Sequence, residues 1–151
     1  IVHLHAACKR LDDCCAVTLL HLPASAIRSW AECVKMPNEV RDFCEIFSEL
    51  NLLVEKAASD ENRLYQSVDV LAWFNRADVW RKPDRGYALL DLAKRIGLNA
   101  NPLIAAMQNA QGLNTAEVIA NVPAQERSNG ERIRSAVDMA RLSAVTSALI
   151  S

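Results

Sequence analysis

Glycine and proline are scarce in this sequence, which limits the folds and sites that it can build. Its 151 residues include 4 glycines and 5 prolines, too few for the many turns of an all-β protein. No glycine-rich loop of any kind is present, so the glycine-based cradles that hold nucleotide phosphates are excluded. Alanine and leucine are abundant instead, and both favour helix.

The side chains that common catalytic sites require are missing as well. All three histidines lie before residue 22, and the Gly-x-Ser-x-Gly turn of serine hydrolases does not occur. There is no Asp-x-Asp pair of the kind that holds two metal ions, and the adjacent Asp12 and Asp13 face different directions if they are helical. We therefore expect no catalytic residue in this chain and no cofactor of its own.

Long apolar runs are also lacking. None approaches the roughly 20 residues that span a bilayer, and nothing resembles a secretory signal. The five cysteines are an odd set, confined to the first third of the chain, and they fit reduced thiols better than a disulfide framework. We expect a cytoplasmic protein with no membrane partner. Because the chain opens on Ile1 rather than methionine, we also expect it to be either a processed piece or a deliberately truncated one.

Zinc is the metal that the N-terminal residues suggest. Six residues of zinc-binding types lie in the first 21 positions: His3, His5, Cys8, Cys14, Cys15 and His21. Zinc sites usually present paired ligands two to four residues apart, whereas adjacent cysteines on a helix point about 100° apart. Buried thiols and surface histidines are the favoured interpretation, so we predict no metal site.

Hydrophobic periodicity predicts an all-α fold, a bundle of about seven short to medium helices. The first clear helix starts at Pro23. The clearest stripe follows Pro37, at spacings of three and four, through Val40, Phe43, Cys44, Phe47, Leu50 and Val54. No segment of four or more residues alternates convincingly as a strand. We accordingly divide the chain into residues 1–22, an N-terminal segment to which we assign no role, and residues 23–151, a helical domain.

Capping residues predict where some of the later helices begin and end. Ser59 and Asp60 are expected to cap a third helix. Its inner face is expected to hold Leu64, Val68, Leu71 and Phe74. Pro83 suits the first turn of the next helix, and Gly97 suits the left-handed position just after its end.

A cluster of cations with aromatic neighbours is the main candidate for ligand binding. Four basic residues lie within ten positions, beside three aromatic ones: Arg76, Arg81, Lys82 and Arg85, with Trp73, Phe74 and Trp80. A guanidinium can donate two parallel hydrogen bonds to phosphate, and an indole can stack on a base. However, Asp78 and Asp84 can pair with the same cations, so a structural role is the alternative.

Net charge gives a weaker signal in the same direction. The chain carries −1 overall; residues 1–60 hold 6 basic and 9 acidic side chains, and residues 61–151 hold 11 and 9. A polyanion would therefore meet the second half, although chance scatter produces an asymmetry this small. The last helix adds several arginines and two compensating acids: Arg127, Arg132, Arg134 and Arg141, with Glu131 and Asp138.

Three segments of the chain resemble a known family. The run from Val68 to Arg85 contains the pattern Phe-x-x-x-Asp-x-Trp-Arg-Lys-Pro-x-Arg, matched by Phe74, Asp78, Trp80, Arg81, Lys82, Pro83 and Arg85. Residues 36–42 read Met-Pro-Asn-Glu-Val-Arg-Asp, and residues 129–134 read Asn-Gly-Glu-Arg-Ile-Arg. In order and spacing, these segments resemble the helical C-terminal portion of bacterial CCA-adding enzymes, of the tRNA nucleotidyltransferase and poly(A) polymerase family. The resemblance covers roughly residues 25–150.

That resemblance implies that residues 23–151 support the acceptor arm of tRNA. It also implies a separate N-terminal head domain, missing here, that carries the metal-binding carboxylates and selects CTP and ATP. Mg²⁺, CTP and ATP are thus expected for the full enzyme only. We expect the RNA-binding residues to be Arg76, Arg81, Lys82, Arg85, Arg132 and Arg134. We expect the loop that presents the first four to be anchored by Phe74, Trp80 and Pro83.

Many members of that family also include an HD-type metal phosphohydrolase, and this sequence departs from its pattern. No histidine is followed by aspartate, and Asn51 and Glu55 stand where phosphohydrolase-bearing members place histidines. We therefore predict a tRNA-binding portion that supports 3′-CCA addition but is not catalytic alone. The alternatives are a metal phosphohydrolase acting on cyclic phosphates or nucleotides, and a helical protein-interaction module. The sequence leaves open whether the chain forms a homodimer.

Overall fold

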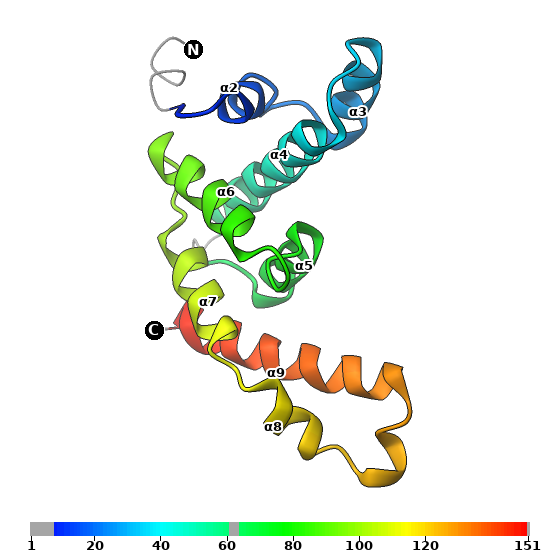
Figure 1. The fold of residues 1–151 in the computed structure, drawn as a ribbon. Coiled ribbons are helices and arrows are strands. Elements are labelled where there is room, and N and C mark those ends of the chain that lie inside the picture. Colours follow the sequence, from blue (N-terminus) through cyan, green and yellow to red (C-terminus); the bar gives the residue numbers. More distant parts are fainter. Residues whose placement is uncertain (1–7, 61–63, 151) are drawn as a thin grey trace. The chain divides into compact units, whose positions relative to one another are not determined.

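The computed structural model describes residues 8–60 and 64–150 of the chain (Figure 1). These residues form eight α-helices and one 3₁₀ turn, and the described part contains no strand. The all-α fold is therefore confirmed, with eight helices where the sequence predicts about seven. Across the described ranges, no helix combines the length and the apolar character needed to cross a membrane.

The helices fall into two compact units, Ile1–Asn101 and Pro102–Ser151. The first unit contains α2 (Leu11–Thr18), α3 (Ala24–Cys33), α4 (Asn38–Ser59), α5 (Ser67–Ala77) and α6 (Pro83–Arg95). The second is built from α7 (Asn101–Gln111), α8 (Thr115–Ala120), the 3₁₀ turn η1 (Ala124–Glu126) and α9 (Gly130–Ile150). The boundary expected between residues 22 and 23 separates a segment without an assigned role from a helical domain. That division by function stays a prediction.

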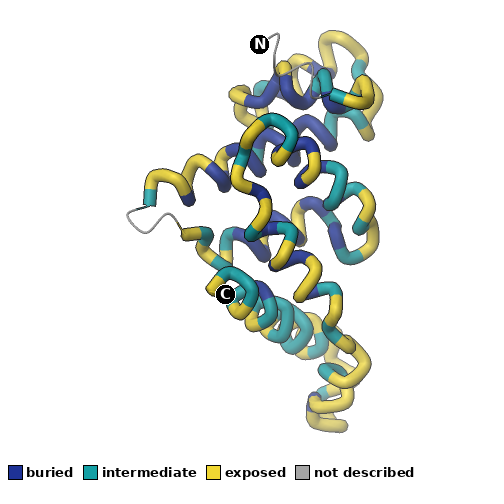
Figure 2. The backbone as a smooth tube through the Cα atoms, turned by 90° about the vertical axis from the view of Figure 1, so that its left-hand side faces the viewer, coloured by how far each residue is buried: buried dark blue, intermediate teal, exposed yellow. Residues whose placement is uncertain are grey.

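Helix α4 is the centre of the first unit, and α2, α3, α5 and α6 all contact it. Its predicted apolar stripe is confirmed, because five of the six positions are buried and Val40 is half-buried. Figure 2 shows buried positions recurring along the helices between exposed ones, as expected for amphipathic helices around a core. The 22 residues of α4 make it the longest helix of the described chain.

The connection between α4 and α5 differs from the prediction. Helix α4 runs on to Ser59, whose hydroxyl donates back to the Glu55 carbonyl at 2.6 Å, and Asp60 is its C-cap rather than an N-cap. Helix α5 begins only at Ser67, so Leu64 lies before the helix. Leu64 and Val68 are 55% and 66% exposed, and neither belongs to the buried face of α5. The expected capping by Ser59 and Asp60 is therefore wrong, because a serine at this point can equally bond the preceding turn. Leu71 and Phe74 are buried as predicted, while residues 61–63 lie outside the described residues.

The turn from α5 to α6 follows the predicted proline and glycine signals. Pro83 occupies the first turn of α6, where its missing N–H costs nothing. At the other end Gly97 has φ of +89°, and the amide of Leu98 donates to the Ala93 carbonyl at 2.9 Å. This is the 6→1 bond of a Schellman motif, which needs a left-handed residue at that position. Both ends of α6 are therefore confirmed.

Helix α2 lies where the sequence predicts no helix. Its first turn is held by Asp13, which is 3% exposed. The Asp13 carboxylate accepts from the backbone amides of Lys9 at 2.9 Å and Arg10 at 3.2 Å. It also accepts from the Arg95 guanidinium on α6 at 3.2 Å. Residues 8–22 are therefore attached to the rest of the first unit through α2.

The second unit has fewer buried side chains. Helix α8 packs against α9 (Figure 1), of whose residues Val145 is fully buried. The Asn109 side-chain amide on α7 donates to the Ala144 carbonyl at 2.7 Å. Arg127 donates to the carbonyls of Val122 and Ala120 at 2.8 and 2.6 Å, which ties the end of α8 to the connection before α9.

Candidate nucleic-acid interface

Two of the motif segments meet at the start of α4. Residues 36–42 contribute Asp42, whose carboxylate accepts from Arg85 Nη1 at 2.9 Å and from Arg76 Nη1 at 3.2 Å. Arg76 is on α5 and Arg85 on α6, so a single carboxylate joins both helices to α4. The structure thus brings together segments that are more than 30 residues apart in the sequence.

The loop between α5 and α6 is fixed by its aromatic residues and by Arg85. Phe74 is fully buried and stands edge-on to Trp80, with ring centroids 5.9 Å apart at 87°, an arrangement that aromatic pairs favour. The Trp80 indole N–H donates to Asn75 Oδ1 at 2.6 Å. Arg85 donates from Nε and Nη2 to the Ala77 carbonyl, at 3.2 and 2.6 Å. Together with Pro83 at the start of α6, these contacts give the loop one conformation.

A buried carboxylate that the sequence analysis missed lies beside this loop. Glu45 is 2% exposed and accepts two hydrogen bonds from Arg28, at 3.1 and 2.8 Å. Arg76 Nη2 donates to it at 3.2 Å, and Arg41 Nε lies 3.6 Å away. Three guanidinium groups therefore surround one carboxylate, which satisfies the buried charge.

The sequence gives no direct signal for Glu45, because at about 100° per residue it lies off the apolar stripe of α4, where an acid is expected to be exposed. Its burial requires partners, because an isolated buried carboxylate is costly. Its hydrogen-bonding partners, Arg28 and Arg76, are 17 and 31 residues away in the chain. Nothing in the local pattern could have identified them.

The predicted RNA-binding residues of the first unit fall into two groups. Arg76 is bonded to Asp42, Glu45 and Glu49, and Arg85 is 23% exposed and held as described. Arg81 and Lys82 are instead exposed on the turn. The first pair is therefore engaged within the protein, while the second pair faces solvent.

Arg81 makes a local ion pair only. It is 82% exposed and lies 2.7 Å from Asp78, three residues earlier. Its hydrogen bonds lower the pKa of the Asp78 carboxyl below the usual value, and Asp78 in turn raises the pKa of Arg81. Such exposed pairs contribute little to stability, so the guanidinium is available to another anion. The Lys82 ammonium has no ion-pair partner within residues 8–60 and 64–150.

The other two predicted RNA-binding residues belong to α9 in the second unit. Arg132 lies 2.7 Å from Glu126 in the 3₁₀ turn. Arg134 is exposed, and no described acid pairs with it. Of this pair, Arg134 is therefore the cation that is open to a ligand.

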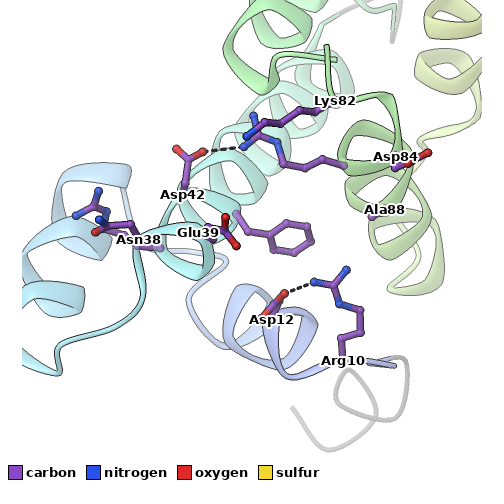
Figure 3. Close-up of a pocket in the computed structure, with 11 residues that line it drawn as sticks. Arg10, Asp12, Asn38, Glu39, Asp42, Lys82, Asp84 and Ala88 are labelled. Carbon is purple, nitrogen blue, oxygen red and sulfur yellow. Dashed lines mark hydrogen bonds and ion pairs between the residues drawn. The ribbon is translucent and has the colours of Figure 1, made fainter. Parts of the chain in front are cut away.

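A polar pocket adjoins the junction of the two motif segments. It has a volume of about 510 Å³ and lies between α2, α4 and α6 (Figure 3). Its lining consists of four cations, four carboxylates and three other residues: Arg10, Arg41, Lys82, Arg85, Asp12, Glu39, Asp42, Asp84, Asn38, Phe43 and Ala88.

No part of the described chain gathers three or more histidine, cysteine or acidic side chains in a way that could hold a metal ion. His3 and His5, which raised the question of zinc, lie outside the described residues. Burial is the main cause that raises the pKa of Cys8 to about 11 and that of Cys44 to about 12. Burial therefore opposes formation of the thiolate, the form that binds a metal ion, at both positions.

Asn51 and Glu55, the positions where the resemblance leads one to expect histidines, contact each other. Asn51 is 3% exposed, and its side-chain amide donates to Glu55 Oε1 at 2.8 Å. This pair satisfies the buried Asn51 amide by a bond within α4. The histidine ligands that the resemblance leads one to expect are absent from both positions.

Comparison with known proteins finds multifunctional CCA proteins among the relatives of this chain. The chain is 27% identical over 141 residues to the multifunctional CCA protein of Aliivibrio salmonicida (strain LFI1238), covering 86% of this chain and 32% of that protein. It is 29% identical over 142 residues to the multifunctional CCA protein of Vibrio vulnificus (strain YJ016), covering 87% of this chain and 32% of that one. A shorter match of 56 residues, 39% identical, links 37% of this chain to 12% of the multifunctional CCA protein of Pasteurella multocida (strain Pm70).

The chain therefore spans about a third of the length of the curated relatives that match most of it. No protein-family model matches the sequence, and no solved structure matches it. The similarity reaches across both compact units, because the longer matches cover 86% and 87% of the chain.

Proposed function

We propose that this chain is the helical tRNA-binding portion of a CCA-adding nucleotidyltransferase. In this role it supports 3′-CCA addition, while the catalytic head belongs to another part of the enzyme. The observation that carries the proposal is the junction at Asp42, where residues 36–42 meet Arg76 and Arg85. The similarity to multifunctional CCA proteins, which extends over 86% of the chain, supports the same assignment.

Within this proposal the cations of the first unit have two roles. Arg76 and Arg85 hold the loop between α5 and α6 against α4, because their hydrogen bonds are taken by carboxylates and a carbonyl. Arg81 and Lys82 contact the phosphates of the acceptor arm from the exposed side of that loop. A phosphate can replace Asp78 as the partner of Arg81, since it offers the same bidentate geometry with more charge.

The second unit adds a further contact. Arg134 is exposed on α9, and Arg132 is 60% exposed in its pair with Glu126. These two arginines give the second unit phosphate contacts of its own, on α9. Arg134 contributes more than Arg132, because it loses no internal ion pair when it binds.

Mg²⁺, CTP and ATP belong to the complete enzyme in this proposal. The residues of this chain do not fit a metal–nucleotide centre, because the sequence has no Asp-x-Asp pair and the described residues hold no cluster of three potential ligands. We therefore assign no chemical step to this chain. Its part is to bind and position RNA.

Nitrocellulose filter binding of labelled tRNA tests the proposal. We expect affinity at about 50 mM salt that falls steeply towards about 200 mM, because each phosphate contact releases counterions. The logarithm of the affinity should decrease linearly with the logarithm of the salt concentration, with a slope of about 0.7 to 0.9 per contact. An absence of tRNA affinity at about 50 mM salt would overturn the proposal.

The phosphohydrolase alternative has a separate test. A turnover assay with a 2′,3′-cyclic nucleotide, combined with metal analysis of the purified protein, distinguishes it from RNA binding. We expect no turnover, because Asn51 and Glu55 bond each other where the resemblance places histidines. Metal-dependent hydrolysis that survives repurification would favour the alternative.

A further inference from the structure

The pocket between α2, α4 and α6 has the size of a small-ligand site. Its volume of about 510 Å³ falls within the range of about 300 to 1,000 Å³ that is typical of such sites. Figure 3 shows Arg10 and Asp12 on the α2 side and Lys82 and Ala88 on the α6 side, with Glu39 on α4 between them. All these residues belong to the first unit.

The two sides of the pocket offer cations of different kinds. Arg10, the N-cap of α2, is 61% exposed and is paired with Asp12 two residues later, which is 25% exposed. Because the guanidinium itself is exposed, the pair is weak and the guanidinium can exchange the carboxylate for a phosphate. Lys82 is the N-cap of α6, whose first turn has no side-chain cap. The helix dipole favours negative charge near Lys82, part of which Asp84 in the first turn of α6 already supplies.

The acids that line the pocket restrict what it can hold. Asp12 and Asp42 are paired with Arg10 and Arg85, whereas Glu39 has no ion-pair partner among the described residues. Four carboxylates balance four cations, so a bare polyphosphate would meet as much repulsion as attraction. A ligand that also carries hydrogen-bond donors fits better, and the hydroxyls of a ribose are such donors.

We propose that this pocket binds one nucleotide unit of RNA. One flanking phosphate contacts Arg10, the other contacts Lys82, and the ribose 2′-hydroxyl donates to Glu39. This inference rests on the proposed function and deepens it. It gives the N-terminal segment, to which the sequence assigns no role, a part in RNA binding through Arg10.

Adenosine 3′,5′-bisphosphate is the probe, because it is a single nucleotide with a phosphate at each end. Isothermal titration calorimetry on the full chain should give binding at least about fivefold tighter than for adenosine 5′-monophosphate, since a second charge-assisted contact is added. The 2′-deoxy analogue and inorganic pyrophosphate should both bind more weakly. Equal binding of pyrophosphate and the bisphosphate would mean a non-specific anion site and would overturn the proposal.

Three variants test the residues. Arg10→Gln and Lys82→Gln should each weaken bisphosphate binding by roughly fivefold, whereas Arg10→Lys should retain most of it. Lys9→Gln is the matched control, because Lys9 is adjacent and exposed but lies 3.9 Å from Asp91 and does not line the pocket. If Lys9→Gln weakens binding as much as Arg10→Gln, the effect is one of net charge and the proposal fails. Circular dichroism establishes that each variant is folded.

The outcomes also separate this inference from the proposed function. If tRNA binds but the bisphosphate does not, the pocket assignment is wrong while the tRNA-binding role stands. If the bisphosphate binds and tRNA does not, the pocket is a nucleotide site and the tRNA-binding role is wrong. Competition between the bisphosphate and tRNA is expected if both are right, and simultaneous independent binding of the two would contradict the inference.

Discussion

The two compact units use their arginines differently. In the first, Arg28, Arg76 and Arg85 bridge separate helices through Glu45 and Asp42. In the second, Arg127 bonds backbone carbonyls within seven residues of itself, and Arg134 is exposed. Long-range ion pairs thus help to build the first unit, whereas the second unit makes mainly local ones.

The same contrast holds for apolar burial. The first unit buries large side chains from several helices, among them Ile27, Phe47, Phe74 and Leu90. In the second, α9 buries Val145 completely but leaves Met139 and Ile150 69% and 81% exposed. We infer that the first unit carries most of the stability.

The largest expected effect comes from Phe74→Ala, which empties the centre of the first unit. Removing a fully buried aromatic ring should lower the free energy of unfolding by about 4 kcal/mol. Urea denaturation monitored by circular dichroism measures it. Val68→Ala on the same helix is the control, since Val68 is 66% exposed and should cost less than about 0.5 kcal/mol. If both variants lose the same free energy of unfolding, Phe74 and Val68 do not lie on the buried and exposed faces of α5 as described.

Glu45→Gln tests the ion-pair network. The substitution leaves three arginines without the negative charge that they share, and it should lower the free energy of unfolding by about 3 kcal/mol. This is the lower end of the range for breaking a buried ion pair, because the arginines are partly exposed. Glu49→Gln should cost less than about 1 kcal/mol, because Glu49 is 31% exposed and pairs with Arg76 only. If Glu45→Gln is neutral in urea denaturation, the long-range network does not build the first unit.

Val145→Ala makes the corresponding test in the second unit. Losing two buried methyl groups should lower the free energy of unfolding by roughly 1.5 kcal/mol, well below the effect of Phe74→Ala. Met139→Ala on the same helix should be close to neutral, because Met139 is 69% exposed. A loss as large as that of Phe74→Ala would remove the contrast between the two units.

Cys44 gives the first unit a dependence on alkaline pH. Burial is the main cause that raises the pKa of its thiol from 9.0 to about 12. Between these two values the folded state keeps the thiol proton and the unfolded state loses it. The stability that the protonated Cys44 contributes is therefore complete below pH 9.0 and is lost as the pH rises towards about 12. Urea midpoints measured on either side of pH 9.0 should fall in the wild type and fall less in Cys44→Ala.

The control for that experiment is Cys33→Ala, because Cys33 is exposed. It should follow the wild type throughout. Tyr65, whose pKa burial raises from 10.0 to about 12, adds a loss of its own above pH 10.0. The loss of stability caused by the Cys44 thiol is therefore measured between pH 9.0 and pH 10.0. An identical pH profile in Cys44→Ala and the wild type would mean that Cys44 is not buried as described.

Local patterns predicted most of the fold. The stripe of α4 and the ends of α6 follow from periodicity, from Pro83 and from Gly97, because each depends on residues within one or two turns. The start of α5 did not follow, since Ser59 can cap a new helix or bond the preceding turn, and local sequence does not separate the two. Helix α2 was missed although Asp13 bonds the nearby amides of Lys9 and Arg10, and the other partner of Asp13, Arg95, is 82 residues away.

The candidate site was predicted only in outline. The cations of residues 76–85 were found by their density, but density does not reveal which of them are already paired. Arg76 and Arg85 differ from Arg81 and Lys82 because of Asp42, more than 30 residues earlier. Glu45 and the pocket beside Arg10 likewise depend on contacts between distant segments. The RNA-binding roles themselves stay predictions.

The most direct test of the central claim compares two double variants in tRNA binding. Arg81→Gln/Lys82→Gln removes the two exposed cations of the loop, and Lys9→Gln/Lys94→Gln removes two exposed cations elsewhere in the first unit. We expect the first to lower the slope of log affinity against log salt by about two, at about one per lost phosphate contact, and the second to leave it unchanged. Equal slopes for the two double variants would contradict the claim that this loop binds tRNA.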